Sequence, residues 1–546
     1  MDREVLLDAG VLTRCRRRVH LDHDPTMRDA PVAPPDPAAE QRMADAREHR
    51  ARVAGELRGS TEASWAVIPA ELSAAERVRL TLAALDERVA YIWGALLPED
   101  GGRRGGPELL VRTDDGYVPV LVVRHRVTDP GQGARTTTLP ELRPARAEHD
   151  ARRKVRSHPR DQLRLAHVRR LLEAAGVAER DRALGGVIGL DADVVVWFDL
   201  RAATWPGGRS VLDEYDARFA DRLAVARAAV HGREPLAEPS RILECKRCQW
   251  WPVCEADLTR SRDVSLVVRG EDAAELRRAG VATVDALAAL DPRGRSPIQW
   301  TGSAFADAVV LARAWRSDLT VVRRVERVDV PRADVEVDID MESFGDSGAY
   351  LWGCLLTVAE GAGLDLAPGY RAFATWEPLP TPDEGNSFAR FWAWLSDVRA
   401  RTAAAGLTFR AYCYNALAEN RWLYASVERF GGTDGVPDRE EVRAFVESDE
   451  WVDLFRSVTE QFLCARGKGL KVVAPVAGFA WRDPEAGGEA SMRWYRAAVG
   501  LDGGSGDATQ RERLLRYNED DVRATRALRE WMSGPAEHAV PYMGDL

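Results

Sequence analysis

Four carboxylates and one tyrosine in the last part of the chain have the types and spacing of a metal centre. Asp340 and Glu342 lie two residues apart in an alternating segment, so on a strand both side chains project from one face. Glu419 opens a helical stretch after a further strand, and Tyr517 and Asp521 lie one turn apart on the last helix. Carboxylates gathered in this way repel one another unless divalent cations join them. Two Mg²⁺ or Mn²⁺ ions about 4 Å apart can stabilise both the attacking and the leaving oxygen of phosphodiester hydrolysis.

The alternative is that these acids lie on solvated helix faces, because short acidic patterns recur by chance. Three neighbouring acids are expected either to be solvated or to support the site from outside: Asp338, Glu519 and Asp520. The two interpretations differ in whether the four carboxylates converge in the folded protein.

A second set of possible ligands consists of cysteines. Cys15 stands alone near the start, and Cys245, Cys248 and Cys254 form a C-x2-C-x5-C run much later in the chain. Four thiolates can hold a [4Fe–4S] cluster, which would tie the first residues to this distant run. Zinc also accepts four thiolates, although its sites usually show two close cysteine pairs. The third possibility is that these are unrelated buried thiols.

The hydrophobic pattern indicates the elements that position these groups in the first half of the chain. Residues 107–127 form two strands joined by TDDG, and residues 194–200 form another buried strand. A basic stretch, 143–170, is predicted to be mostly helical. Three of its cations would hold nucleic-acid phosphates or else belong to a solvated face: Arg152, Arg153 and Lys154.

Residues 263–290 predict a small all-α unit. Two short helices meet at Ala279-Gly280-Val281, and residues 296–316 would supply the next helix. This resembles a helix–hairpin–helix, in which a glycine lets backbone amides approach a phosphate. An ordinary αα-hairpin fits the pattern equally well.

After a linker at about 318–333, the pattern changes to strands followed by helices, which is typical of an α/β domain. With 546 residues, 45% of them hydrophobic, the whole chain is predicted to be an α/β multidomain protein.

Composition also restricts partners and location. A net charge of −10 excludes a bulk polycation, so nucleic acid must be held by local basic surface. The start lacks the apolar core of a signal peptide, and no apolar stretch reaches about eighteen residues. Seven cysteines are too few for a disulfide scaffold, and thiolate ligands suit a reducing compartment. We therefore expect a soluble cytoplasmic protein without a membrane partner.

The order D-x-E, N-x3-E, Y-x3-D resembles the three exonuclease motifs of the DEDD superfamily, which has a ribonuclease H-like fold. Glu419 stands where the proofreading enzymes usually have Asp. Asp453 in WVDLF and Lys471 in GLKVV resemble further segments of bacterial YprB-like ribonuclease H-like domains. The resemblance implies that Tyr517 orients the attacking water, and that two Mg²⁺ or Mn²⁺ ions are bound by Asp340, Glu342, Glu419 and Asp521.

The first half resembles RecB-family nucleases of the PD-(D/E)xK fold, whose iron–sulfur members show the same one-plus-three cysteines. His49 matches the first-motif histidine, and Glu108 stands where Asp is expected. Leu121 and Val123 occupy the third-motif positions of the acid and the lysine. Because an acid ligand and a lysine are missing, we expect this domain to be inactive and to serve as a DNA-holding platform.

The whole chain resembles the bacterial RecB-like nuclease family. The resemblance implies a RecB-like PD-(D/E)xK domain with an iron–sulfur staple at 1–260, an all-α helix–hairpin–helix at 261–325, and at 330–546 a ribonuclease H-like exonuclease domain with a mixed sheet and flanking helices.

This resemblance implies a metal-dependent nuclease (EC 3.1 class), a 3′–5′ exonuclease acting on DNA rather than RNA in repair or processing. No G-x4-G-K-[ST] motif occurs, so unwinding would need a separate helicase. Two alternatives stay open: a nucleic-acid-binding scaffold without catalysis, and activity that resides in the RecB-like domain through His49 and Glu108.

Overall fold

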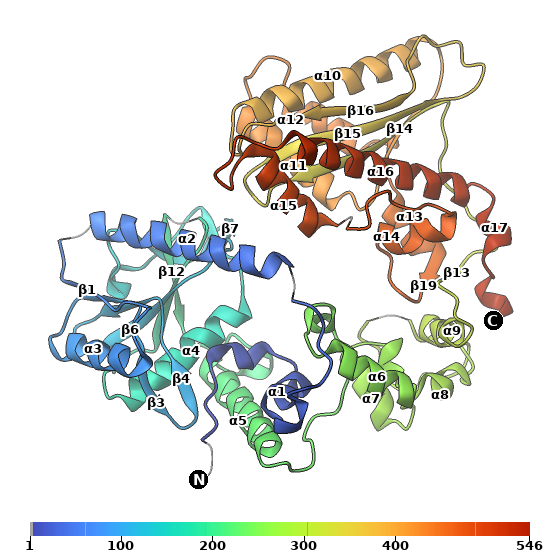
Figure 1. Ribbon diagram of the computed structural model, residues 1–546. Helices are drawn as coiled ribbons and strands as arrows, with labels where there is room; N and C mark the ends of the chain where they lie inside the picture. Colours follow the sequence, from blue (N-terminus) through green and yellow to red (C-terminus); the bar gives the residue numbers. More distant parts are fainter. Residues whose placement is uncertain (1–3, 36, 61, 192, 303, 486) are drawn as a thin grey trace. The chain divides into compact units, whose positions relative to one another are not determined.

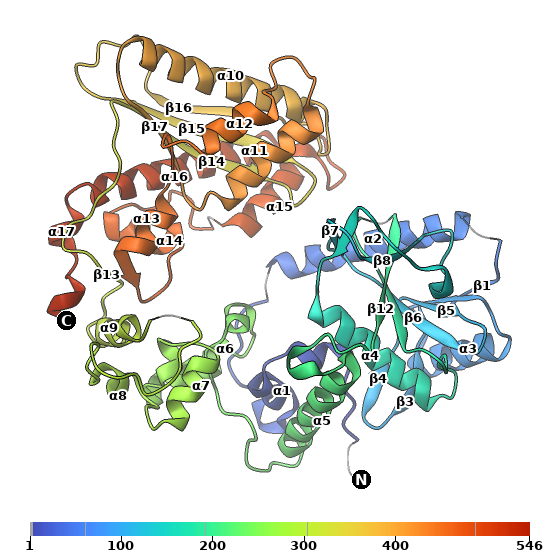
Figure 2. The ribbon, with the colours of Figure 1, turned by 180° about the vertical axis from the view of Figure 1, so that it is seen from behind.

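Two mixed sheets, one in each half of the chain, form the framework of the protein (Figures 1 and 2). The computed structural model describes residues 4–35, 37–60, 62–191, 193–302, 304–485 and 487–546. The chain divides into two units, Met1–Arg260 and Ser261–Leu546. The expected helical unit at 261–325 and the expected C-terminal domain at 330–546 both lie in the second of them. None of the helices in the described segments is long and apolar enough to cross a membrane.

The sheet of the second unit has five strands in the order β16-β15-β14-β17-β18. The central strand β14 runs antiparallel to β15 and parallel to β17, so the sheet is mixed, as predicted. The strand bounds are β14 (Val335–Ser343), β15 (Ala349–Val358), β16 (Gly369–Ala374), β17 (Phe409–Cys413) and β18 (Trp451–Asp453).

The alternation along β14 separates the two faces of this sheet. Its apolar residues at 335, 337, 339 and 341 belong to a core with α10 (Asp383–Ala404), α11 (Leu417–Phe430) and α12 (Arg439–Val446). The other face carries the acids at 336, 338, 340 and 342 and is covered by α15 (Gly488–Val499) and α16 (Ala508–Met532) (Figure 1). The smaller elements nearby are α13 (Leu454–Gln461), α14 (Leu470–Val473) and α17 (Ala536–Ala539).

The second unit begins with three short helices, α7 (Glu271–Arg278), α8 (Val284–Ala288) and α9 (Phe305–Arg316). Gly280 lies between the first two at φ +84, a left-handed conformation that favours glycine, and Thr283 caps α8. The segment 318–333 was expected to be a linker, and this is wrong in part. It contains β13 (Val321–Arg323), which pairs with β19 (Phe462–Cys464) and so is held against the domain that follows.

The first unit contains an eight-stranded sheet in the order β1-β2-β5-β6-β11-β12-β8-β9. The predicted hairpin at 107–127 is present as the antiparallel pair β5 and β6. The sheet strands are β1 (Trp65–Val67), β2 (Tyr91–Trp93), β5 (Leu109–Arg112), β6 (Tyr117–Val122), β8 (Arg135–Thr138), β9 (Glu148–His149), β11 (Leu184–Ile188) and β12 (Val194–Asp199). Two smaller pairs are formed by β3 (Leu97–Asp100) with β4 (Arg103–Gly105) and by β7 (Thr128–Pro130) with β10 (Arg153–Val155).

Helices cover both faces of this sheet. Residues of α2 (Pro37–Gly59) share one core cluster with β6, and residues of α4 (Pro159–Ala174) and α5 (Val211–Val230) share another. Further helices are α1 (Arg16–His23), α3 (Ala74–Asp86) and α6 (Trp251–Ser261).

The prediction of a mostly helical 143–170 is wrong in its first half. Helix α4 begins only at Pro159, because a proline fits the first turn of a helix and disfavours helical geometry in the residue before it. The residues before it instead form the short strands β9 and β10, and β10 pairs with β7.

Candidate metal centre

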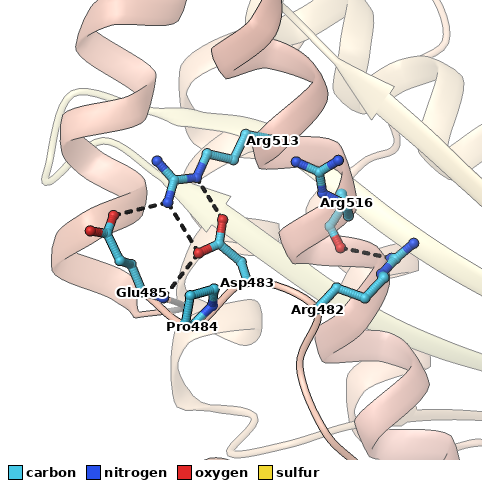
Figure 3. Close-up of a pocket in the computed structure, with 6 residues that line it drawn as sticks. All are labelled: Arg482, Asp483, Pro484, Glu485, Arg513 and Arg516. Carbon is cyan, nitrogen blue, oxygen red and sulfur yellow. Dashed lines mark hydrogen bonds and ion pairs between the residues drawn. The ribbon is translucent and has the colours of Figure 1, made fainter.

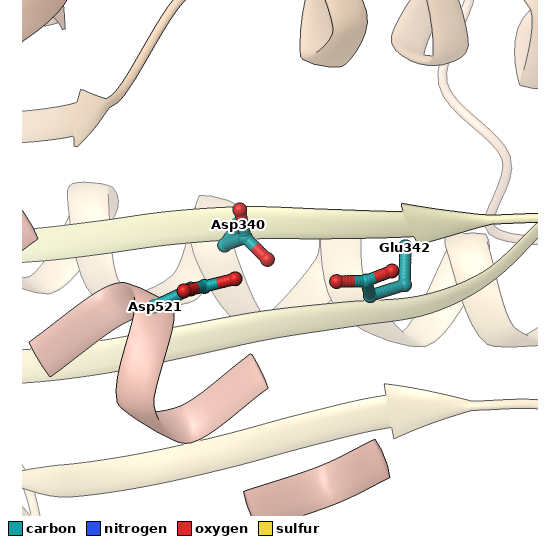
Figure 4. A group of neighbouring side chains, drawn as sticks. All are labelled: Asp340, Glu342 and Asp521. Atoms are coloured by element: carbon teal, nitrogen blue, oxygen red, sulfur yellow. The ribbon is translucent and has the colours of Figure 1, made fainter. Parts of the chain in front are cut away.

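Three carboxylates converge between the central strand and the last long helix of the second unit. Asp340 and Glu342 project from β14, and Asp521 projects from α16 toward them (Figure 4). One ligand oxygen from each lies within 4.8 Å of the other two. Among the described residues, this is the only group of three or more His, Cys, Asp or Glu side chains that meets this spacing. Oxygen ligands at this spacing suit Mg²⁺ or Mn²⁺.

The acidic stripe of β14 is neutralised along only half of its length. Arg529 of α16 is fully buried, donates to Asp338 at 2.8 Å and forms an ion pair with Glu336. Arg332 adds a second cation to Glu336, at 2.7 Å. Asp338 is therefore a buried ion-pair partner that supports the site, not a solvated acid. The next two acids on the strand, Asp340 and Glu342, accept hydrogen bonds from neutral side chains instead.

Those donors orient the ligand carboxylates. The amide of Asn518 donates to Asp340 Oδ2 at 2.8 Å, and the Ser491 hydroxyl donates to Glu342 Oε2 at 3.1 Å. In both carboxylates these bonds leave the other oxygen for an ion. None of these donors carries a sequence signal of its own. The third carboxylate of the group, Asp521, is oriented in the same way, since the Trp481 indole donates to its Oδ1 at 2.6 Å.

A glycine makes room for the Asn518 side chain. Gly353 of β15 lies directly opposite Asp340 in the sheet. A Cβ atom at this position would be 1.5 Å from Asn518 Oδ1, which also accepts a bond from Tyr370 at 2.7 Å. Any larger residue at 353 would therefore displace the amide that holds Asp340.

Burial and mutual repulsion make the carboxylates weak acids. Burial raises the pKa of Asp340 well above its usual range, and the charges of Asp521, Glu342 and Glu419 raise it further. Burial raises the pKa of Glu342 to about 8, with a further contribution from Asp521. Without a cation these groups hold protons near neutral pH, and a divalent ion would replace those protons.

Glu419 lies near this group but outside the closest trio. It belongs to the first turn of α11 and is buried, and one of its carboxylate oxygens has no hydrogen-bond partner among the described residues. Burial raises its pKa to about 8. Its charge also raises the pKa of Asp340, which shows that the two groups are electrostatically close.

Asp453 holds the turn that leads to Glu419. Its carboxylate accepts bonds from the backbone amides of Asn415 at 2.9 Å and Ala416 at 3.2 Å, and it also caps α13. Asn415 has φ +75, a conformation that Asn tolerates better than most residues. The acid thus positions the start of α11.

Tyr517 and Lys471 complete the site. The Lys471 ammonium lies 3.2 Å from the Tyr517 hydroxyl and above the rings of Tyr517 and Trp481. Burial, followed by the nearby carboxylates, raises the pKa of Tyr517 far above its usual range. The hydroxyl therefore stays protonated and can act as a hydrogen-bond donor rather than as a base.

In the first unit, the four cysteines that we singled out line one cavity: Cys15, Cys245, Cys248 and Cys254. The Cys15 amide donates to Glu244 at 2.6 Å, which joins the two ends of this unit. Burial raises the pKa of Cys254 to about 12. No three of these four sulfurs share the 4.8 Å spacing that defines the carboxylate group.

His49 and Glu108 take part in different interactions. His49 is buried on α2, and burial together with Arg52 lowers its pKa, so the ring is neutral at physiological pH. Glu108 accepts from Arg164 at 3.2 Å and lies 3.4 Å from Arg50. Two guanidinium groups thus surround the carboxylate where a cation would have to bind. Leu121 and Val123 are buried in the apolar core that includes α4 residues.

The predicted phosphate contacts lie on the surface and in a turn. Arg152 and Lys154 are exposed beside and within β10, while Arg153 pairs with Asp150 at 3.0 Å and also with Asp193. The amide of Gly280 donates to the Arg277 carbonyl. That amide is therefore already engaged in ending α7.

Comparison with known proteins supports the C-terminal part of this description. Residues 427–533 match the model of the RNase H superfamily, RNase_H_2. No curated protein and no solved structure gives a match to the chain. The matched segment includes Asp453, Lys471, Tyr517 and Asp521, and it begins after Asp340, Glu342 and Glu419. The C-terminal part is thus ribonuclease H-like, which indicates a nuclease-type or nucleic-acid-related function.

Proposed function

We propose that the protein is a metal-dependent nuclease that hydrolyses phosphodiesters with two divalent ions in its C-terminal part. The observation that carries this proposal is the convergence of Asp340, Glu342 and Asp521 within 4.8 Å. The RNase H superfamily match over 427–533 supports it, because such domains usually use divalent ions. Glu419 would be the fourth ligand.

Each residue has a role that follows from its surroundings. The bound ions would supply charge stabilisation for the attacking and leaving oxygens. Asp340, held at one oxygen by Asn518, would have its other oxygen available for a bound ion. The protonated Tyr517 hydroxyl, steadied by Lys471, holds the attacking water by a hydrogen bond.

We further propose DNA as the substrate and 3′–5′ exonucleolysis as the mode, both on the DEDD resemblance. The first unit would be an inactive RecB-like platform, because Glu108 is engaged by arginines and the apolar Leu121 and Val123 replace the acid and the lysine. Its four cysteines would hold a [4Fe–4S] cluster. The helical hairpin around Gly280 would add a contact to the DNA backbone.

The test is a cleavage assay on oligonucleotides labelled at both ends, single- and double-stranded, DNA and RNA, with Mg²⁺ and Mn²⁺ compared. We expect Asp340→Asn to lose at least a hundredfold in rate, since it removes one charge from the metal ligands. Asp346→Asn is the matched control, because this exposed acid follows the same strand and pairs with Arg421 outside the carboxylate group.

The outcomes separate the alternatives. Cleavage that Asp340→Asn leaves intact but His49→Ala abolishes would place the activity in the first unit. Binding without cleavage by the wild type under any of these conditions would identify a scaffold and refute the proposed function.

A further inference from the structure

Two arginines of α1 lie in the cavity that the four cysteines line in the first unit. Arg17 and Arg18 come shortly after Cys15, and both belong to the lining of this cavity. A [4Fe–4S] cluster held by four thiolates is an anion, and a buried anion requires positive charge or hydrogen-bond donors beside it. Four thiols next to two guanidinium groups therefore suit such a cluster.

Arg17 is a largely buried cation. Its side chain is 15% exposed, and its Nε atom is buried without a hydrogen-bond partner among the residues that the structure describes. The two terminal nitrogens make long contacts, at 3.5 Å to the Ala237 carbonyl and at 3.7 Å to Asp257. Asp257 also accepts from Arg260 at 3.0 Å. A buried guanidinium in this state is costly unless a further anion lies next to it.

Arg18 is neutralised more completely. It donates to Glu244 at 2.9 Å, and its Nε lies 3.8 Å from Asp22. Glu244 also accepts from the Cys15 amide, so this ion pair joins α1 to the segment that carries the cysteine run. These contacts account for the position of Arg18, whereas the carboxylate beside Arg17 is shared with another arginine.

The arginines of another cavity show how such groups are usually satisfied. An open cavity of about 580 Å³ beside α16 is lined by Arg482, Asp483, Pro484, Glu485, Arg513 and Arg516 (Figure 3). Arg513 donates to Asp483 at 2.6 and 3.0 Å. Arg482 Nε donates to Asp520 at 2.7 Å. These two cations are matched by acids of the protein itself at hydrogen-bonding distance, unlike Arg17.

The charge of Arg17 acts on one of the possible sulfur ligands. Burial raises the pKa of Cys254 to about 12, and the charge of Arg17 is the largest influence that opposes it. The guanidinium and this sulfur are therefore electrostatically close. Positive charge and hydrogen bonds next to cluster sulfurs raise the reduction potential, because the reduced cluster carries one more negative charge than the oxidised one.

We infer that Arg17 donates its Nε–H to a sulfur of the [4Fe–4S] cluster and compensates part of the negative charge of that cluster. Arg17 is thus a positioning residue for the cluster and not one of its ligands. It raises the reduction potential and slows the loss of iron. The inference rests on the cluster of the proposed function and is independent of the proposed cleavage.

The experiment compares the full-length wild type with Arg17→Gln and Arg17→Lys, all purified anaerobically, with iron and sulfide determined in each. A reductive titration with dithionite, followed by EPR and by absorption near 400 nm, gives the midpoint potential. In Arg17→Gln we expect the ratio of reduced to oxidised cluster at the wild-type midpoint to fall about tenfold or more, which corresponds to a midpoint lower by about 59 mV for one electron. Arg17→Lys keeps the charge and should shift the midpoint by less.

The rate at which an iron chelator removes the cluster is the second readout, and it does not require a reducible cluster. Loss of a group that orients a metal site weakens metal binding, so iron release from Arg17→Gln should be roughly tenfold faster than from the wild type. Complete loss of the cluster from Arg17→Gln, with Arg17→Lys still loaded, would support the same conclusion.

Arg16→Gln is the matched control. Arg16 lies on the same helix, has a 46% exposed side chain, pairs with Asp221 at 2.9 Å and is not part of the cavity lining. An Arg17→Gln variant that matches Arg16→Gln in both potential and iron release would overturn the inference. A wild type purified without iron would overturn it together with the proposed cluster. A loaded wild type that shows the Arg17-specific changes but cleaves no nucleic acid would refute the proposed catalysis alone.

Discussion

At the scale of single residues, the candidate metal centre depends on an incomplete neutralisation of one strand. Four acids share a face of β14, and Arg529 with Arg332 neutralises the first two. Beside Asp521, Glu342 is buried and Asp340 half-buried, and among the described residues neither has an ion-pair partner. Loss of hydration and repulsion therefore raise their pKa values, which the charge of Lys471 only partly offsets. The fold tolerates this arrangement because the groups can hold protons, or exchange them for divalent ions.

The stability of the metal-free protein should therefore fall as the pH rises from about 5 to 8.5. Asp340 and Glu342 hold protons in the folded state that they lose in the unfolded chain above about pH 4.5, so unfolding releases protons across this range and becomes easier with increasing pH. We expect the Tm in EDTA to drop by roughly 5–10 °C between pH 6 and 8.5, and Mn²⁺ or Mg²⁺ to restore it. The measurement is calorimetry of the wild type, with Asp346→Asn as the control. A Tm in EDTA that does not change over this range would contradict the prediction.

At the scale of elements, the turn from β17 into α11 decides where Glu419 lies. The turn places Asn415 at φ +75 and is held by amide bonds to Asp453, which belongs to β18. Asp453 thus links β18 to the start of α11. Because this start is held, Glu419 lies near the carboxylate group, where one of its oxygens has no hydrogen-bond partner among the described residues.

Asp453→Ala should reduce the cleavage rate by more than its loss of unfolding free energy accounts for. The loss of a helix-capping carboxylate costs about 1–2 kcal/mol of unfolding free energy, whereas a displaced Glu419 should reduce the metal-dependent rate at least tenfold. Asp438→Ala is the matched control, because Asp438 caps α12 by accepting from Glu441 at 2.8 Å. Chemical denaturation and cleavage rates measured on both variants check this. Equal losses of activity in the two variants would show that Asp453 has no positioning role.

At the scale of the whole molecule, each unit has its own candidate inorganic site. The second unit contains the carboxylate centre, and in the first unit the cavity lined by Cys15 and the cysteine run joins the start of the chain to residues 245–254. A cluster held by these four thiolates would restrict the unfolded chain more than a local link, because it would close a very long loop.

Cys15→Ser should therefore remove bound iron and destabilise the first unit. By analogy with a covalent link across a loop of this length, we expect a loss of about 5 kcal/mol. Iron and sulfide analysis, absorption near 400 nm and the Tm of anaerobically purified protein measure the effect, and Cys464→Ser is the control for a cysteine in the other unit. Metal-dependent cleavage should persist in Cys15→Ser. Stoichiometric zinc in the wild type, with no iron, would refute the iron–sulfur assignment.

Local patterns in the sequence were enough to predict several features. The alternation of β14, the hairpin of β5 and β6, the turn at Gly280 and the order of the acidic motifs all depend on neighbouring residues, and the structure contains each of these elements. The helix expected over 143–170 begins late, since pairing of β10 with β7 prevails over local helix propensity. Likewise the expected linker contributes β13 to a sheet with β19.

The amino-acid sequence by itself determined which residue types could bind metals and in which order they occur, because ligand chemistry belongs to individual side chains. Only the tertiary structure decided which acids are available. Asp338 and Asp340 are chemically identical and two residues apart, yet Arg529 neutralises one while Asn518 merely orients the other. That difference arises from α16, almost two hundred residues away in the chain, and long-range packing of this kind leaves no local pattern to read.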